Sequence, residues 1–245
     1  METQDYIFGL RPVREAIEAG RNLEKVMIGK NLQGELAREV LSLIRQNGIP
    51  YQFVPVEKLN RMTRKNHQGI IAITSLVLYQ SFEEIVTAVF ESGRDPMVVI
   101  LDGITDVRNL GAIARSAEAA GMDAILIPEK GSAQVNPDAM KTSAGALSII
   151  PVCRTADLVR SIKYLKNAGL KITGASEKAQ MDFYQADFRS PLALVMGSED
   201  TGIDPAIRAI MDQEVRIPMM GKISSLNVSA AAAVLFFEAV RQRGK

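Results

Sequence analysis

The chain of 245 residues contains one cysteine and one histidine. A single cysteine, Cys153, excludes an internal disulfide framework and a zinc site built from several cysteines. No apolar run approaches the roughly 18 to 20 residues that a membrane-spanning helix requires. The formal net charge is only +1, so any binding to nucleic acid has to depend on a local basic patch.

Signals for secretion and for metal binding are also missing. The N-terminal segment METQDYIFGLRPVREA has neither a basic region nor a following apolar region, so we expect a cytoplasmic protein. There is no H-x-x-x-H spacing and no cluster of carboxylates, and no metal site is expected. Cys153 lies in a predicted buried strand, where a lone cysteine is more often a core residue than a nucleophile.

The chain is rich in alternating strand and helix patterns. β-rich segments and amphipathic helical segments alternate over residues 6–77 and again from Met97 onward. Alternation of this kind is typical of the α/β class, in which helices cover both faces of a parallel sheet. We predict a first α/β domain over residues 1–78, a linker over 79–95, and a second α/β domain over 96–245.

Three predicted strands of the second domain run into loops that carry glycine and polar residues. These loops follow the strands at 97–102, 192–196 and 214–218. Because ligands of parallel α/β sheets bind beyond the carboxyl ends of the strands, the three loops are predicted to form one site. None of them contains a G-x-G-x-x-G pattern or a phosphate-binding loop, which disfavours an ordinary dinucleotide or nucleoside triphosphate site.

The polar residues in or just beyond these loops are the candidates for the site: Asn109, Arg115, Glu199, Ser225 and Asn227. Each one also has a simpler explanation. Asn109 is explained as a helix cap, Arg115 as a surface cation whose stem lies on apolar surface, and Glu199 as a loop carboxylate. The segment SSLN, residues 224–227, precedes the most apolar helix and has more capping side chains than one helix needs. All five candidates lie in or just beyond loops at strand ends, and this shared position favours a functional site.

Three stretches of the second domain resemble the signature motifs of the SpoU (TrmH-like) RNA 2′-O-ribose methyltransferase family. They are LDGITD with NLGAIAR, then LVMGSEDTGI, then IPMMGKISSLNVSAA, in the family's order. SAQVNPDAMKTSAGAL and HQGIIA are similar to the family's two-domain branch, which methylates a guanosine ribose in large-subunit ribosomal RNA. The similarity covers nearly the whole chain. One departure is Asp200, where many relatives have glycine.

The resemblance implies a fold and a cofactor. The second domain would be a parallel-sheet SPOUT domain with a trefoil knot, and the first a small ribosomal-protein-like (L30e-like) RNA-binding domain. Knots are rare and are not predicted by periodicity. The family binds S-adenosylmethionine without a metal and is commonly homodimeric. By motif position, Gly197, Ile217 and Leu226 would line the cofactor pocket.

The same resemblance assigns the polar candidates to the reacting centre. Methylation of a ribose hydroxyl requires that the hydroxyl be positioned and its proton removed. With no histidine in the second domain, the candidate proton acceptors are Glu199, an RNA phosphate and Arg115, although arginine normally stays protonated. We expect Arg115, held by Asn109 and Glu199, to bind a phosphate with two hydrogen bonds. Ser225 and Asn227 would anchor the site.

A basic run in the first domain is the candidate RNA contact: Arg61, Arg64, Lys65 and His67. An isolated charge run is more often a solvated face, but the role of this domain in the resembled family favours RNA binding. The predicted function is methyl transfer from S-adenosylmethionine to the 2′-hydroxyl of a guanosine in 23S ribosomal RNA. A transfer-RNA methyltransferase of the same family, a non-catalytic ribosome-assembly protein and, less favoured, an adenine-nucleotide-binding protein remain as alternatives.

Overall fold

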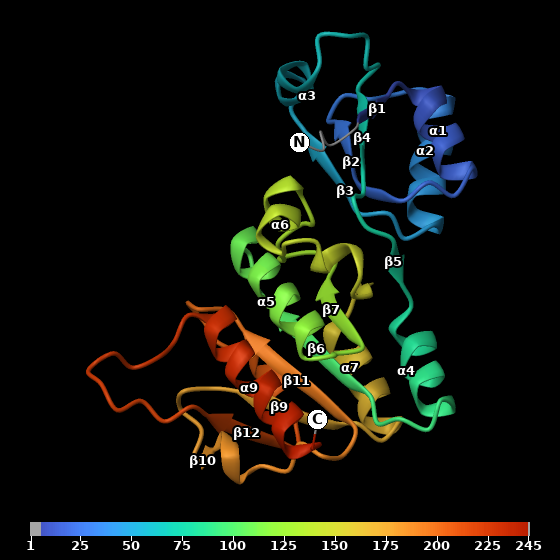
Figure 1. Cartoon of the computed structure of the whole chain (residues 1–245). Coiled ribbons are helices and arrows are strands. Elements are labelled where there is room, and N and C mark those ends of the chain that lie inside the picture. Colours follow the sequence, from blue (N-terminus) through green and yellow to red (C-terminus); the bar gives the residue numbers. More distant parts are fainter. Residues whose placement is uncertain (1–5, 245) are drawn as a thin grey trace. The chain divides into compact units, whose positions relative to one another are not determined.

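A computed structural model describes residues 6–244 of the chain (Figure 1). The chain divides into two compact units, a smaller one that ends at Leu78 and a larger one formed mainly by the residues from Tyr79 onward. The segment 79–95, expected to be a linker, is instead part of the larger unit. Its strand β5 (Tyr79–Gln80) pairs with another strand of that unit, and its helix α4 (Phe82–Glu91) buries Phe82 and Val86 in the core.

The smaller unit is built on a four-stranded mixed sheet with the strand order β1-β4-β2-β3. Strands β2 and β3 are parallel, and β4 is antiparallel to both β1 and β2. Helices α1 and α2 pack against one face of the sheet, and α3 packs against the other. The elements are β1 (Tyr6–Phe8), α1 (Leu10–Glu18), β2 (Leu23–Gly29), α2 (Glu35–Gln46), β3 (Tyr51–Val54), α3 (Val56–Met62) and β4 (Ile70–Thr74).

The HQG sequence of the smaller unit forms a turn that joins three of its elements. The His67 ring accepts a hydrogen bond from the amide of Gly69 at Nδ1 (3.0 Å), which places the ring proton on Nε2, 2.8 Å from Oδ1 of Asn60 on α3. Gln68 has a left-handed backbone (φ 51°), and its side-chain oxygen accepts from the amide of Leu10, the first residue of α1 (2.9 Å). The turn therefore ties α3, β4 and the start of α1 together.

The larger unit contains an eight-stranded sheet with the order β10-β12-β9-β11-β6-β7-β8-β5. All seven pairings between neighbouring strands are parallel, as the apolar strand patterns predicted. Besides β5, its strands are β6 (Met97–Asp102), β7 (Ala124–Pro128), β8 (Val152–Thr155), β9 (Lys171–Ala175), β10 (Met181–Asp182), β11 (Leu192–Gly197) and β12 (Gln213–Arg216).

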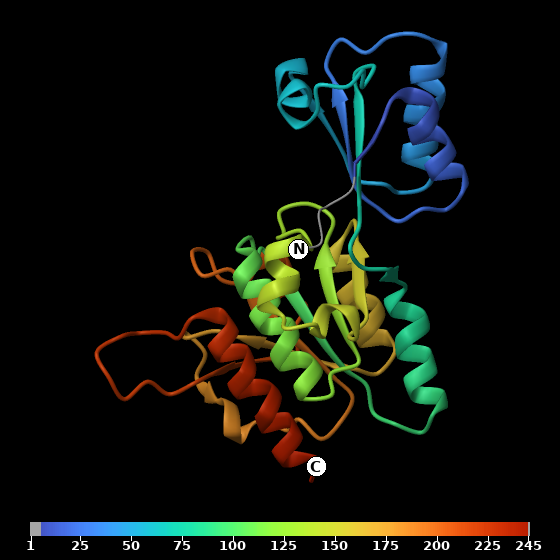
Figure 2. The ribbon, with the colours of Figure 1, turned by 45° about the horizontal axis from the view of Figure 1, so that its top comes forward.

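Helices cover both faces of this sheet (Figures 1 and 2). Helices α4, α7 and α8 place apolar side chains on one face, and α5 packs along α9 on the other. The helices after α4 are α5 (Val107–Ala119), α6 (Pro137–Thr142), α7 (Leu158–Asn167), α8 (Pro205–Arg208) and α9 (Val228–Gln242), with short 3-10 turns at Ala146–Ser148 and Phe183–Gln185.

The predicted buried strand around Cys153 is β8. It begins at Val152, because Ile149 lies in a turn after the first 3-10 helix and is 68% exposed. Cys153 is buried in β8, as expected, and burial raises the pKa of its thiol to about 12. No helix within residues 6–244 is long and apolar enough to cross a membrane.

Candidate active site

The three polar loops of the larger unit meet at the carboxyl-terminal ends of the parallel strands. Strands β6 and β11 are neighbours, and their last residues, Asp102 and Gly197, are paired in register. The Asp102 carboxylate accepts a hydrogen bond of 2.6 Å from the amide of Asp204, so the loop after β11 is attached to the end of β6. Burial raises the pKa of Asp102, and the amide hydrogen bond acts in the opposite direction. This attachment was not visible in the sequence.

The loop after β11 forms a tight turn that presents Glu199. Ser198 and Gly202 exchange two backbone hydrogen bonds (3.1 and 3.0 Å), and the Ser198 hydroxyl bonds that of Thr201 (2.7 Å). A Cβ atom at Gly197 would lie 2.4 Å from the carbonyl carbon of Gly202, so only glycine permits this close return of the chain. Asp200 is exposed in the turn, whose backbone hydrogen bonds are intact.

A hydrogen-bonded cluster connects the three loops. One oxygen of Glu199, Oε1, accepts hydrogen bonds from the Asn227 amide (2.6 Å), the Asn109 amide (3.3 Å) and the backbone amide of Val228 (3.3 Å). The Asn227 amide also donates to the side-chain oxygen of Asn109 (3.0 Å). We call Asn109, Glu199 and Asn227 the carboxamide–carboxylate cluster. Its members come from sequence positions up to 118 residues apart.

The capping alternatives are resolved by the same geometry. The side-chain oxygen of Asn227 accepts from the amide of Ser229 (2.9 Å) and caps α9. Its amide group simultaneously donates to the cluster, so one residue of the SSLN segment serves as cap and site residue. Asn109 is not the cap of α5, because Asp106 occupies that position. The capping explanation for Asn109 was therefore wrong.

Arg115 and Ser225 do not join the cluster. Arg115 follows Asn109 by six positions, so the two side chains lie on different faces of α5. Arg115 is exposed and forms no hydrogen bond or ion pair with the described part of the chain. The expectation that Asn109 and Glu199 hold Arg115 was wrong, because both instead bond each other and Asn227. Ser225 lines the neighbouring cavity without a hydrogen bond of its own among the described residues.

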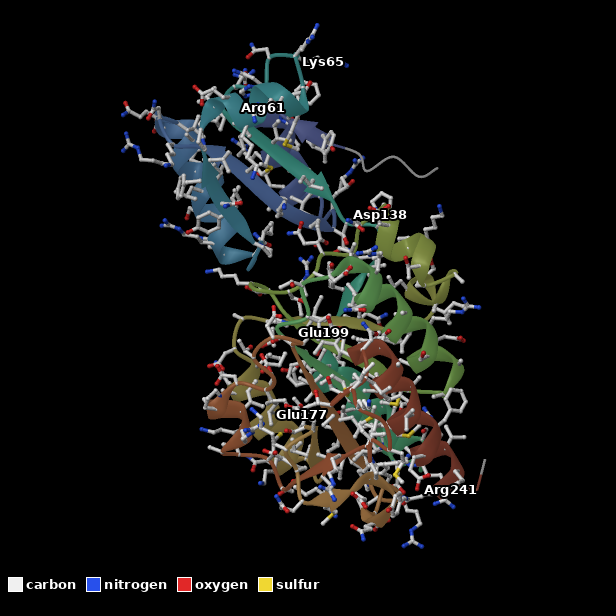
Figure 3. All side chains as sticks on the ribbon, turned by 90° about the vertical axis from the view of Figure 1, so that its left-hand side faces the viewer. Arg61, Lys65, Asp138, Glu177, Glu199 and Arg241 are labelled. Carbon is white, nitrogen blue, oxygen red and sulfur yellow. The ribbon has the colours of Figure 1, made fainter. Side chains whose placement is uncertain are left out.

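A cavity of about 480 Å³ opens beside the cluster. The three residues expected in a cofactor pocket all line it: Gly197, Ile217 and Leu226. Ser176 and Glu177 also line it, and Figure 3 shows Glu177 and Glu199 in the same unit. Neither residue was among the predicted site residues, although both follow the end of β9, where the same pattern of polar residues beyond a strand end is present. No group of residues within 6–244 could hold a metal ion.

The basic run of the smaller unit separates into surface and core residues. Arg61, at the last turn of α3, and Arg64 and Lys65, in the loop that follows, are exposed (Figure 3 labels Arg61 and Lys65). None of the three forms an ion pair with a described residue. His67 is only 8% exposed and uses both ring nitrogens in hydrogen bonds to Asn60 and Gly69, so it differs from the three exposed cations with which it was grouped.

Sequence comparisons match both units to known families. Residues 96–237 match the SpoU rRNA Methylase family, and residues 6–80 match the family described as RNA 2′-O ribose methyltransferase substrate binding. The chain is 36% identical to a 23S rRNA (guanosine-2′-O-)-methyltransferase RlmB of Photobacterium profundum over 98% of this chain and 99% of that protein. It is 35% identical to the putative TrmH family tRNA/rRNA methyltransferase YacO of Bacillus subtilis over 99% of this chain and 97% of that protein.

Solved structures show the same architecture. The SpoU methyltransferase AviRb from Streptomyces viridochromogenes, crystallised in complex with S-adenosylmethionine, superposes with a TM-score of 0.62. The two chains are 27% identical, and the match covers 98% of this chain and 90% of AviRb. A second similar structure is the S-adenosylmethionine-bound rRNA methyltransferase from Sinorhizobium meliloti, at 25% identity, a TM-score of 0.59, and coverage of 96% and 86% of the two chains.

Proposed function

The chain belongs to the SpoU family of RNA methyltransferases, and from this premise we propose that it methylates the ribose 2′-hydroxyl of a guanosine in 23S ribosomal RNA. The chain is an RNA methyltransferase that uses S-adenosylmethionine. The RlmB relative and the match of the smaller unit to a substrate-binding family support the ribosomal substrate. An enzyme with this substrate is expected in the cytoplasm.

The observation that carries this proposal is the carboxamide–carboxylate cluster, two of whose members, Glu199 and Asn227, line the cavity. A protein that only bound RNA would not need Asn109, Glu199 and Asn227 bonded to one another beside a cavity of about 480 Å³. The cavity has apolar walls, including Met196 and Val215, which suit a purine ring. Its polar groups suit the ribose and the amino-acid part of S-adenosylmethionine.

We assign Gly197, Ile217 and Leu226 to cofactor binding, since all three line this cavity. When bound, S-adenosylmethionine supplies a methyl group that its sulfonium has already activated. The protein then has to orient the ribose hydroxyl and accept its proton. Because Oε1 of Glu199 accepts all three hydrogen bonds that this carboxylate receives, Oε2 is the oxygen that faces no donor among the described residues.

We propose that Arg115 binds the phosphate next to the target ribose. Its guanidinium is exposed and has no partner within residues 6–244, so it is available for a bidentate contact with a phosphate. The proton of the 2′-hydroxyl would pass to Oε2 of Glu199 or to that phosphate. Ser225, without an internal hydrogen bond at the cavity wall, is assigned to the substrate side of the site.

The remaining family expectations also belong to this proposal. We expect the chain between β11 and α9 to form the trefoil knot, the smaller unit to have an L30e-like fold, and the protein to be a homodimer. The half-exposed ring of Phe237 on α9 supports a covered apolar surface in the dimer. Light scattering tests it: a dimer has twice the chain mass of 26.7 kDa.

The function is tested by methyl transfer from labelled S-adenosylmethionine to unmodified 23S ribosomal RNA, with transfer RNA in parallel and the modified ribose mapped. The proposal expects one labelled guanosine 2′-oxygen in the ribosomal RNA. Label in transfer RNA alone would retain the chemistry and overturn the substrate. RNA and cofactor binding without any label would favour a non-catalytic assembly protein.

A further inference from the structure

The smaller unit contains a cavity of its own, of about 300 Å³, between its sheet and helix α2. Cross-strand pairing places Ile70 of β4, Ile28 of β2 and Phe53 of β3 in one row, since Ile28 is paired with both of the others. This row forms the floor of the cavity. Ala37 and Leu41 of α2 lie on the opposite side. The cavity is therefore formed entirely within the fold of the smaller unit.

One residue of this floor, Phe53, has an aromatic ring that is not buried in the core. Phe53 lies on the edge strand β3 and is 47% exposed, although Ile28 and Ile70 beside it are at most 3% exposed. Tyr51 contacts its ring edge-on, with 5.8 Å between the ring centroids, and restricts its orientation. Half of an oriented aromatic ring thus remains available to a ligand.

Polar groups without internal partners surround the opening. Gln33, in the loop before α2, and Arg38, on the first turns of α2, line the cavity. Neither side chain forms a hydrogen bond or ion pair with any described residue. The nearby carboxylate of Glu39 is paired with Arg14 (3.5 Å), whereas Glu35 is exposed at the start of α2. The free donors at the opening are thus an amide and a planar guanidinium.

The cavity lies against the turn that follows the exposed basic residues along the chain. Leu32, which lines it, packs against Gly69, where a Cβ atom would lie 3.0 Å from the Leu32 methyl group. Gly69 closes the turn that follows Arg64 and Lys65 along the chain. Lys65 itself lies over the ring of Phe8, on the face of the sheet that α3 covers, so the cations and the cavity belong to different faces of the sheet.

We propose that this cavity binds a single unpaired base of the RNA substrate. An apolar floor, an exposed aromatic ring, an arginine plane and an amide that bonds base edges are the chemistry by which proteins bind unstacked bases. The volume is at the lower end of the range for small-molecule sites and suits one base rather than a peptide segment. The inference rests on the proposed RNA substrate, and it names a second RNA contact apart from the methylated ribose.

The test uses the full-length protein and a 23S ribosomal RNA transcript as the probe. Phe53→Ala removes the ring, Phe53→Leu retains apolar bulk, and Phe90→Ala removes another exposed phenylalanine, on α4 (36% exposed). RNA affinity is measured between low and moderate salt. Phe53→Ala is expected to lose roughly 10- to 100-fold in affinity at every salt concentration, Phe53→Leu nearly as much, and Phe90→Ala none.

The salt dependence distinguishes base binding from phosphate binding. A variant that loses a phosphate contact, such as Lys65→Gln, is expected to reduce the slope of log affinity against log salt by about one. Phe53→Ala should leave this slope unchanged. Chemical probing of the RNA should show one unpaired base that wild type and Phe90→Ala protect and Phe53→Ala exposes, and Arg38→Gln should weaken the same protection.

Each result decides the proposal. Equal affinity and equal base protection for wild type and Phe53→Ala, with methylation of the RNA retained, would overturn the base site and leave the proposed function standing. Wild-type protein that neither binds nor methylates the transcript would overturn the proposed function and this inference together. Unchanged cofactor affinity and melting temperature in each variant show that any loss comes from RNA binding.

Discussion

At the scale of single residues, Asn227 combines two roles that are usually separate. Its side-chain oxygen caps α9, and its amide group donates to Glu199 and Asn109. An asparagine carries an acceptor oxygen and an NH₂ donor on separate atoms of one short side chain, whereas ionised aspartate has no donor and serine has both functions on a single hydroxyl. A substitution at Asn227 can therefore keep the capping acceptor and remove the amide donor.

Replacing Asn227 by Ser should retain the cap and lose the amide donor. We expect stability to change by less than about 0.5 kcal/mol, because serine caps as well as asparagine, and methyl transfer to fall roughly 100-fold through misplacement of Glu199. Asn227→Ala should lose a similar amount of activity and, in addition, about 1 kcal/mol of stability. Thermal unfolding and single-turnover methylation measure the two effects. Full activity of Asn227→Ser would contradict the role of the cluster.

Arg115 gives a second prediction at this scale. Because Arg115 is exposed and has no partner in the described chain, Arg115→Ala should alter stability by no more than about 0.5 kcal/mol. Methyl transfer should be abolished while cofactor affinity, measured by calorimetry, stays nearly intact. Arg115→Lys should recover only part of the activity, since an ammonium does not form the bidentate phosphate contact. Equal losses of activity and cofactor affinity would make Arg115 part of the cofactor pocket.

At the scale of elements, the end of β11 determines the shape of the site. The turn from Ser198 to Gly202 folds back over Gly197 so closely that no side chain fits there. The same turn carries Glu199 into the cluster, and its exit is attached to β6 through Asp102 and Asp204. A small change at Gly197 therefore displaces both the wall of the cavity and the side chain of Glu199.

Gly197→Ala tests this coupling. Its Cβ would meet backbone atoms within 2.4 to 2.6 Å, so the turn has to move, and cofactor affinity and methyl transfer should both fall by roughly tenfold or more. Gly221→Ala is the matched control, because no atom lies within 4 Å of the added methyl group and its backbone is not left-handed. Wild-type cofactor affinity in Gly197→Ala would show that the turn adapts without cost.

At the scale of the whole molecule, chemical labelling of the single cysteine can measure how often the larger unit opens. Cys153 is fully buried in the sheet core, and burial raises the pKa of its thiol to about 12, so the reactive thiolate is scarce at neutral pH. Reaction with a thiol reagent has to await opening of the unit. The rate of labelling therefore measures how often the unit opens.

We expect negligible labelling of the native protein within minutes and complete labelling in denaturant. S-adenosylmethionine at about 100 times its dissociation constant should slow native labelling roughly 100-fold, because the cofactor binds only the closed unit. Mass spectrometry of the intact protein follows the reaction. Rapid labelling of the native protein would show that β8 and its neighbours open without global unfolding.

The sequence by itself determined the α/β class, the parallel sheet and, through the resemblance of its motifs, the family. The class and the sheet follow from local information: apolar strands, helical periodicity, and polar residues placed just beyond strand ends. Asn109, Glu199 and Asn227 could be grouped in this way because the carboxyl ends of parallel strands meet at one edge. The positions of Gly197, Ile217 and Leu226 around the cavity followed from the motifs.

Only the tertiary structure decided which of these groups bond to one another. It separated Arg115 from Asn109, buried His67 in a turn, and joined Asp102 to a loop 102 residues away. Residue spacing specifies the face of a helix or strand on which a side chain lies, but not which distant loop packs against that face. Those contacts depend on how the whole sheet and its helices pack, which short stretches of sequence do not encode.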